Sequence, residues 1–387
     1  MRIASSKFTH ERHALRHPIG FKGRKLSELW QSLVCLTASD GTRSYGSGIQ
    51  SVLWSDAEVF AAHDETMVNA MMLLTTGYAA SVAESKDWVD PLTLLDQILA
   101  LVHEQARRVT GRPALRPTFT LNSLVPLDVA AWLLFARAHR LTSFDALIPE
   151  RFRARLKRRH QELAVIPLIA YSIPPAEIAG LLQQRHCMLK IKIGNDPEGD
   201  GDPAKMLAWD QQRLEQIHRM AEGYETPWTD SGRILYYLDA NGRYDSLERV
   251  QRLLEHARRI GAFERIALFE EPFAEEVHLP VGDLGVRIVA DESAHDTVDV
   301  LERIALGYGA IALKPVAKTL SMSLRMLDQA AAHGVPCFCA DLTVDPLLRE
   351  WNKNVAARID PIPGMRIGMV ESNGAQNYAA WGDLVSR

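Results

Sequence analysis

The chain has 387 residues, which is more than one small core needs and predicts two domains, or a barrel of about 250 residues with an extra module. Hydrophobic residues make up 47% and charged residues 24%, so disordered and fibrous classes are excluded. The 44 Lys and Arg nearly balance the 48 Asp and Glu. A net charge of -4 gives no support for a nucleic-acid or membrane partner, because such partners usually leave a basic excess.

Four cysteines (Cys35, Cys187, Cys337 and Cys339) are too few and too scattered for a disulfide framework, which favours a reducing compartment. No apolar run approaches the roughly 20 residues that span a bilayer, and the basic N-terminus lacks the apolar stretch of a secretory signal. We therefore expect a cytoplasmic protein.

The first part of the chain, to about residue 158, has an α+β pattern. After a first strand at Ile3–Leu15, two β-prone runs flank Asp40-Gly41, which is a strong hairpin signal. Helical patterns follow, with Asp56 and Asp90 at N-cap positions. The expected helices are Ala57–Ala80, Pro91–Val109 and Pro126–His139.

From about Val165 onward, short apolar runs alternate with amphipathic stretches. This alternation over some 200 residues predicts a parallel sheet with crossover helices, and seven or eight units favour a closed barrel over an open sheet. A long connection, residues 195–233, has its own helix with Asp202 as N-cap. The expected strands are Val165–Ser172, Met188–Gly194, Ile234–Asn241, Ile266–Phe273, Val286–Ser293, Ala310–Pro315 and Pro336–Asp341.

Two lysines lie on one face of the second of these strands. The period of two in a strand places Lys190 and Lys192 together and leaves Leu189, Ile191 and Ile193 for the helices. Both ammonium groups would then face the barrel interior, where they are costly unless anions or chemistry require them.

Three acidic residues close the next three strands. Asp239, Glu270 and Asp291 are in phase with the inward residues of their strands, and they are 31 and 21 residues apart. Three converging carboxylates repel one another unless a cation lies between them, and Mg²⁺ prefers such oxygen ligands. The sequence therefore predicts a magnesium site, in which Mn²⁺ could substitute.

A further lysine, Lys314, ends the sixth strand in the inward phase. In a barrel it would face Lys192 across the mouth, with the three acids on the arc between them. Two opposed bases around a metal-held substrate suit removal of a proton from the carbon next to a carboxylate, which gives an enolate. The metal and the second ammonium would lower the pKa of the lysine that acts as base.

The chain resembles the enolase superfamily, in its muconate-lactonizing enzyme subgroup (mandelate racemase/muconate lactonizing enzyme-like proteins). The resemblance lies in five motifs that occur in the family's order: K-x-K, D-x-N (Asp239 and Asn241), E-E-P, A-D-E-S and the late lysine. The resemblance covers nearly the whole chain. It implies an α/β fold, a modified (β/α)7β barrel of the TIM type under an α+β capping domain. The implied divisions are 1–158 for the cap, 159–371 for the barrel and 372–387 for a segment that returns toward the cap.

The resemblance also implies roles for individual residues. Lys192 and Lys314 would form the acid/base pair, with Lys190 assisting electrostatically, and the three acids would hold one Mg²⁺. Substrate contacts are expected from Asn241, Asp341 and Glu371, and two cap loops near His17–Phe21 and Gly46–Trp54 would close the mouth. Family members are commonly homo-oligomers, which sets the expectation for this chain.

Some features depart from the subgroup pattern. Glu271 stands where glutamine is common, no glycine pair follows Lys314, and Lys318 is a second candidate for the late lysine. Asp341 could instead be a helix N-cap. The end of the barrel lacks the D-x-D associated with dipeptide epimerases.

The reaction is left open among several. A racemase, epimerase or cycloisomerase of a small carboxylate, such as an amino-acid derivative, is expected first. A syn-dehydratase of the o-succinylbenzoate-synthase or acid-sugar type uses the same lysine pair. A Schiff-base lyase would leave the three carboxylates unexplained, and a binding protein on a retained barrel would leave the buried charges unused.

Overall fold

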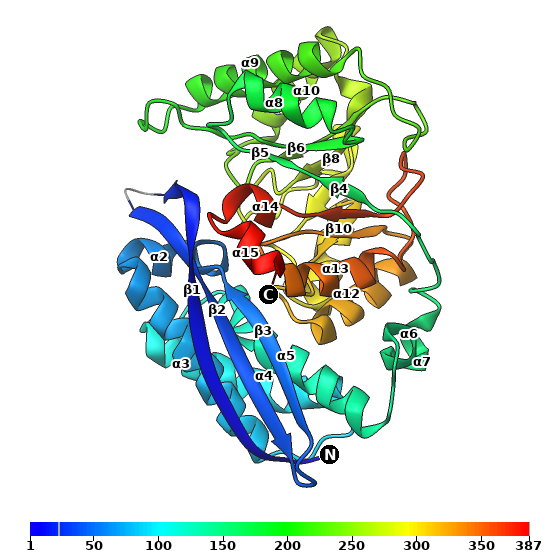
Figure 1. The fold of residues 1–387 in the computed structure, drawn as a ribbon. Coiled ribbons are helices and arrows are strands. Elements are labelled where there is room, and N and C mark those ends of the chain that lie inside the picture. Colours follow the sequence, from blue (N-terminus) through cyan, green and yellow to red (C-terminus); the bar gives the residue numbers. More distant parts are fainter. Residues whose placement is uncertain (22–23, 387) are drawn as a thin grey trace.

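The structure is a computed structural model that describes residues 1–21 and 24–386. Its N-terminal part contains a three-stranded antiparallel sheet of order β1-β2-β3, which is blue in Figure 1. The strands are β1 (Ile3–Phe21), β2 (Arg24–Ala38) and β3 (Arg43–Gln50). The predicted hairpin is confirmed: the Ala38 N–H donates to the Thr42 carbonyl at 2.8 Å, and Gly41 takes the positive φ of 83° that the turn requires.

The two expected cap loops are largely strand in the structure. Residues 17–21 extend β1, residues 46–50 belong to β3, and α1 (Val52–Ser55) follows after one residue. That expectation of loops was wrong, because β1 pairs with β2 as far as Phe21 and β3 pairs with β2 as far as Gln50.

The cap helices pack against the sheet. The helix expected at 57–80 is in fact two helices, because Asp64 caps a second one with its carboxylate on the Met67 N–H. Asp56 and Asp90 are N-caps as predicted. The helices are α2 (Ala57–Ala62), α3 (Glu65–Glu84), α4 (Pro91–Thr110), α5 (Pro117–Ala138), α6 (Phe144–Leu147) and α7 (Glu150–Arg153).

Helix α5 begins nine residues earlier than expected and carries Pro126 inside it. Two glycines of β3 lie directly against this proline: a Cβ at Gly46 would be 2.0 Å from the Pro126 carbonyl oxygen, and one at Gly48 would be 2.5 Å from its Cδ. The sheet therefore approaches the helix at the point where the proline interrupts its hydrogen bonding.

By length and composition alone, helix α5 could cross a membrane. The expectation that the chain contains no apolar run of this length was therefore wrong. In the structure 83% of this stretch is buried inside the protein, so its apolar character is accounted for by packing.

The second sheet has nine parallel strands in the order β4-β12-β11-β10-β9-β8-β7-β6-β5. Its two ends, β4 (Ala164–Ile166) and β5 (Leu168–Ile169), are separated in the chain only by Pro167, so the sheet curls into a nearly closed barrel. The other strands are β6 (Met188–Lys192), β7 (Leu235–Asp239), β8 (Ile266–Glu270), β9 (Ile288–Ala290), β10 (Ala310–Leu313), β11 (Cys337–Cys339) and β12 (Met369–Glu371).

Helices surround the barrel, as Figure 1 shows. The connection at 195–233 contains α9, with Asp202 as its N-cap as predicted. The helices are α8 (Pro175–Gln183), α9 (Pro203–Ala221), α10 (Leu247–Arg259), α11 (Thr297–Ala305), α12 (Leu320–Ala332) and α13 (Pro346–Ala356), with short 3-10 turns at Phe263–Arg265 and Gly282–Leu284.

The inward phase of the barrel strands is the predicted one. Alternate residues of successive strands form one buried cluster: Met188, Tyr237, Leu268, Val289, Ala310, Ala312, Phe338, Ala340 and Met369. Leu189, Ile191 and Ile193 belong to the layer between strands and helices. The polar side chains that continue the inward phase therefore lie at the carboxyl ends of the strands.

After β12 the chain leaves the barrel through α14 (Gly374–Asn377) and α15 (Trp381–Ser386) and reaches the cap sheet. The Ala379 N–H donates to the Ala14 carbonyl at 3.0 Å, and Tyr378 is buried among cap residues. All four cysteines are in the described residues, and none is in a disulfide.

Candidate active site

Lys190 is buried at the centre of the carboxyl end of the barrel, with 3% of its surface exposed. Its Nζ lies 2.9 Å from Asp239 Oδ2, 3.2 Å from Glu270 Oε1 and 3.1 Å from Glu371 Oε2. It also donates to the Tyr237 hydroxyl at 3.2 Å. One ammonium thus joins the carboxylates of three strands.

Lys192 lies beside it, nearer to solvent. Its Nζ donates to Asp239 Oδ2 at 2.6 Å and to the Asn241 side-chain oxygen. The strand register explains this contact, because Lys192 pairs with Asp239 across β6 and β7, and Asp239 pairs with Glu270 across β7 and β8. The predicted D-x-N motif therefore belongs to the same cluster as the K-x-K motif.

Lys314 occupies the other side of the cluster. Its Nζ donates to Asp291 Oδ2, and it lies 4.5 Å from the ring centre of Trp54, which belongs to α1 of the cap. Lys318 is also present: it donates to the Asp291 main-chain oxygen at 2.6 Å and to Oδ1 at 3.2 Å. Trp54 covers the lysines from the cap side.

Two of the three predicted carboxylates converge closely, together with one that was not predicted. Ligand oxygens of Glu270, Asp291 and Glu292 all lie within 4.8 Å of one another. Asp239 is joined to Glu270 through Lys190 and is not in this closest group. Glu292 was not expected in the site, because it follows Asp291 directly and strand alternation would turn it away. The strand ends at Ala290, so that alternation no longer holds.

The side chain of Glu271, which stands where glutamine is common, accepts hydrogen bonds from the segment that follows β9. Its Oε1 accepts from the Asp291 N–H at 2.6 Å, the Ser293 N–H at 2.9 Å and the Ser293 hydroxyl at 2.7 Å. Burial and the neighbouring Glu292 raise the pKa of Glu271 to about 8. Burial and Asp291 likewise raise the pKa of Glu292 to about 7.

Several non-glycine residues at this end of the barrel have a positive φ. The values are 44° at Asn241, 39° at Glu271, 70° at Thr319 and 56° at Thr343. Such backbone is rare outside glycine, costs about 1–3 kcal/mol per residue and clusters at functional sites. Each of these residues lies in a segment that follows a barrel strand.

Asp341 and Glu371 differ in what they reach. Glu371 continues the inward phase of β12 and contacts Lys190. Asp341 is in phase with Cys337 and Cys339, on the helix side of β11, and its carboxylate accepts from the main-chain N–H of Asn373 at 2.7 Å and of Val344 at 3.3 Å. It organises two loops, and the N-cap of α13 is Asp345.

The carboxylates set the protonation of the lysines. Burial alone would lower the pKa of Lys314, but Asp291, Glu292 and Glu270 raise it, and the pKa of Lys190 is raised well above its ordinary value in the same way. Burial works against ionisation of Asp239, but Lys190 and Lys192 hold its pKa low. This direction is opposite to the lowered pKa expected from the sequence, because each lysine directly contacts a carboxylate.

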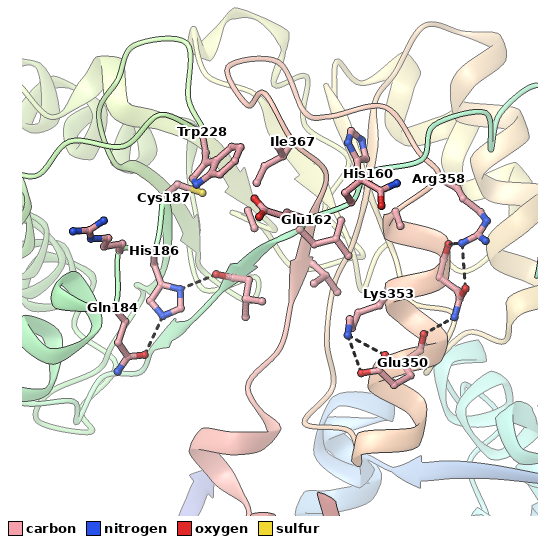
Figure 2. A pocket seen from close by; sticks show the side chains of 18 residues that line it. His160, Glu162, Gln184, His186, Cys187, Trp228, Glu350, Lys353, Arg358 and Ile367 are labelled. Carbon is pink, nitrogen blue, oxygen red and sulfur yellow. Dashed lines mark hydrogen bonds and ion pairs between the residues drawn. The ribbon is translucent and has the colours of Figure 1, made fainter.

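A separate cavity of about 710 Å³ lies on the outside of the barrel (Figure 2) and contains none of these residues. It is lined by β4, the segment before β6 and helix α13, with His186, Trp228, Lys353 and Ile367 among its residues.

Comparisons with known proteins identify solved structures that share this architecture. No protein-family model and no curated protein matches the sequence. The structure is similar to a mandelate racemase/muconate lactonizing protein from Herpetosiphon aurantiacus, with TM-score 0.70, 16% identity and 98% and 91% of the two chains covered. It is also similar to a dipeptide epimerase from Enterococcus faecalis V583 complexed with Mg and L-Leu-L-Tyr, with TM-score 0.70, 15% identity and 98% and 92% coverage.

A third neighbour is an N-succinyl Arg/Lys racemase from Bacillus cereus ATCC 14579, with TM-score 0.67, 15% identity and 98% and 89% coverage. The structural neighbours thus include racemases and epimerases of the mandelate racemase/muconate lactonizing enzyme and enolase groups over the full chain. At this level of identity the similarity establishes the barrel with its capping domain.

Proposed function

We propose that this protein is a divalent-metal-dependent enzyme, related to mandelate racemase and muconate lactonizing enzyme, that abstracts the proton next to the carboxylate of a small substrate. The observation that carries the proposal is the arrangement of Lys192 and Lys314 on opposite sides of one group of carboxylates at the mouth of a barrel. A structural role alone does not explain so many buried charges, which are costly to maintain.

The residues fit a hard divalent cation. Glu270, Asp291 and Glu292 offer oxygens within 4.8 Å of one another, and Asp239 is paired in register with Glu270. Oxygen donors of this kind suit Mg²⁺, with Mn²⁺ as a substitute. We propose Asp239, Glu270 and Asp291 as the ligands, with Glu292 close enough to compete with Asp239. A bound ion would offset the carboxylate charge that raises the pKa of Lys314 and would stabilise negative charge on the substrate carboxylate.

The protein residues would divide the remaining work. Lys192 and Lys314 would remove and return a proton on opposite faces of the substrate carbon, and Lys190 would hold Asp239, Glu270 and Glu371 in place. Trp54 would separate Lys314 from bulk water on the cap side. We also propose that residues 1–158 act as a cap over a catalytic barrel of residues 159–371.

Racemisation or epimerisation of an amino-acid derivative is the reaction we put first. Two opposed bases suit transfer of one proton on one carbon, and the neighbours include a dipeptide epimerase and an N-succinyl amino-acid racemase. The four free thiols suit a reducing compartment, so the cytoplasm is the proposed location.

A substrate screen tests the proposal directly. Dipeptides, N-acylamino acids, acid-sugars and muconates would be incubated with the protein in D₂O, and α-deuterium incorporation followed by NMR. We expect incorporation with at least one class, loss after exhaustive EDTA treatment, and return on addition of Mg²⁺ or Mn²⁺. Full activity in the metal-free protein would contradict it, and borohydride-trapped substrate on Lys314 would favour a Schiff-base lyase.

A further inference from the structure

Lys318 is a buried cation that the proposed proton transfer does not use. It has no exposed surface, and its Nζ donates to the main-chain oxygen of Asp291 at 2.6 Å and to Oδ1 at 3.2 Å. Because its side chain is fully buried, Lys318 has no face open to a substrate. A buried ammonium without a chemical role is destabilising unless its partners need it.

Lys314 and Lys318 bind different oxygens of the Asp291 carboxylate. Lys314 donates to Oδ2, and Lys318 donates to Oδ1 and to the carbonyl. A carboxylate that is held at one oxygen and at its own main chain cannot rotate freely about its side-chain bonds. The second oxygen, Oδ2, is therefore presented in one direction.

The turn that carries Lys318 is itself fixed from the cap. The Lys318 N–H donates to the Lys314 carbonyl at 2.7 Å, and Thr319 has a φ of 70°. Directly after it, the N–H groups of Leu320 and Ser321 donate to Asp128 Oδ2 at 2.9 and 3.3 Å, and Asp128 belongs to the cap helix α5. The position of the Lys318 side chain therefore depends on a rigid turn rather than on a flexible loop.

We propose that Lys318 is a positioning residue, which clamps Asp291 so that its Oδ2 is available to a divalent ion. This inference rests on the proposed metal site and deepens it. Lys314 can leave Oδ2 when an ion binds, whereas Lys318 keeps its two contacts. Loss of groups that orient a metal ligand typically costs about 10–100-fold in metal affinity.

Binding of Mn²⁺ alone, measured by calorimetry on EDTA-stripped full-length protein, tests the proposal without any substrate. Lys318→Met is expected to weaken Mn²⁺ binding at least tenfold. Lys314→Met is the matched control, because it removes the other ammonium from the same carboxylate. It is expected to bind Mn²⁺ at least as tightly as the wild type, since it removes a competing cation.

The outcomes separate the two levels of the proposal. Unchanged or tighter Mn²⁺ binding by folded Lys318→Met, or equal weakening in both variants, would overturn the role of Lys318 while leaving the metal site in place. A wild type that does not bind Mn²⁺ would overturn both. If Lys318→Met does not fold, Lys318→Gln is measured instead, and failure of both variants to fold would assign Lys318 to the fold and overturn the positioning role.

Discussion

At the scale of single residues, the candidate site is a network of ion pairs between lysines and carboxylates at the ends of neighbouring strands. Lys190, Lys192, Asp239, Glu270 and Asp291 could be predicted from the sequence, because each continues the inward alternation of an apolar run. Inside a barrel this alternation leaves only one direction for each side chain. The structure brings all five into one cluster.

Asp341 lies differently from the other predicted site residues. It lies at a strand end like the others, but in the opposite phase, and its carboxylate binds main-chain N–H groups. Glu292 was missed as a site residue, and Lys318 was named only as a second candidate for the late lysine. Both lie beyond the ends of their strands, where the direction of a side chain depends on a turn.

Replacing either proposed base should separate chemistry from metal binding. In Lys192→Ala and Lys314→Ala we expect the rate of α-deuterium incorporation to fall by at least 10²-fold, because general acid–base groups contribute about 10²–10⁴-fold. Mn²⁺ binding should persist, since neither lysine is a ligand. Exchange that survived in both variants would assign the bases elsewhere.

At the scale of elements, cap and barrel are joined by hydrogen bonds to two buried carboxylates, one from each part. Asp128 of α5 accepts from the first N–H groups and the Ser321 hydroxyl of α12, and Trp132 donates to that hydroxyl at 3.0 Å. Asp345, the N-cap of α13, accepts from Gln31 of β2 and Ser47 of β3 at 2.7 and 3.1 Å. Such caps stabilise helix ends and fix the position of the cap domain.

The buried Asp128 should make the stability of the fold depend on pH. Burial raises its pKa from 3.8 to about 6, although hydrogen bonds from Ser321 and Leu320 oppose this. Because the folded state then holds a proton that the unfolded state releases, the free energy of unfolding should decrease as pH rises from about 4 to about 6, by roughly 3 kcal/mol for this group.

Urea unfolding at several pH values would measure this effect. Asp128→Asn keeps an acceptor and removes the titration, so its stability should change less over this range. Ser321→Ala serves as the control, because it keeps the carboxylate and should keep the slope. An equal slope in the wild type and in Asp128→Asn would show that other groups determine the pH dependence.

The contact between β3 and α5 should be intolerant of any side chain. A Cβ at Gly46 would lie 2.0 Å from the Pro126 oxygen and 2.4 Å from the Ala130 nitrogen, and main-chain atoms cannot move aside cheaply. Gly46→Ala should lower the free energy of unfolding by about 1–3 kcal/mol or more. Gly180→Ala, in α8 with nothing within 4 Å of the added carbon, should instead raise it by about 0.5–1 kcal/mol. Denaturant titration of both variants would check the contrast.

At the scale of the whole molecule, the site is assembled from the barrel and covered by the cap. Trp54 reaches the lysines from α1, and the C-terminal segment returns from β12 to β1. A ligand that binds only this assembly should therefore stabilise the entire fold.

Thermal unfolding should respond to metal. Binding to the folded state alone adds about 2.7 kcal/mol when the free ion is at 100 times its Kd. We expect Mg²⁺ to raise the Tm of EDTA-stripped protein, and Glu270→Gln to abolish most of the rise. A Tm that is insensitive to Mg²⁺ and Mn²⁺ in the wild type would contradict the metal site.

The sequence by itself determined the alternation of strands and helices, the hairpin at Asp40-Gly41, and the inward phase of the lysines and acids. These depend on periods of two and 3.6 residues and on local turn chemistry, which are properties of short segments. They predicted a closed barrel after an α+β segment and most of the charged cluster, and the resemblance to a known family added the role of that segment as a cap.

Only the tertiary structure decided which groups touch. Pro126 lies inside a helix because two glycines of a distant strand leave room for it, and the described part of β1 continues through residues where a loop was expected. Glu292 joins the site because a turn brings it there, and the contacts that Lys318 and Trp54 make within the site are likewise set by a turn and by the packing of the cap. Contacts of this kind are set by packing between segments far apart in the chain, so no local pattern in the sequence encodes them.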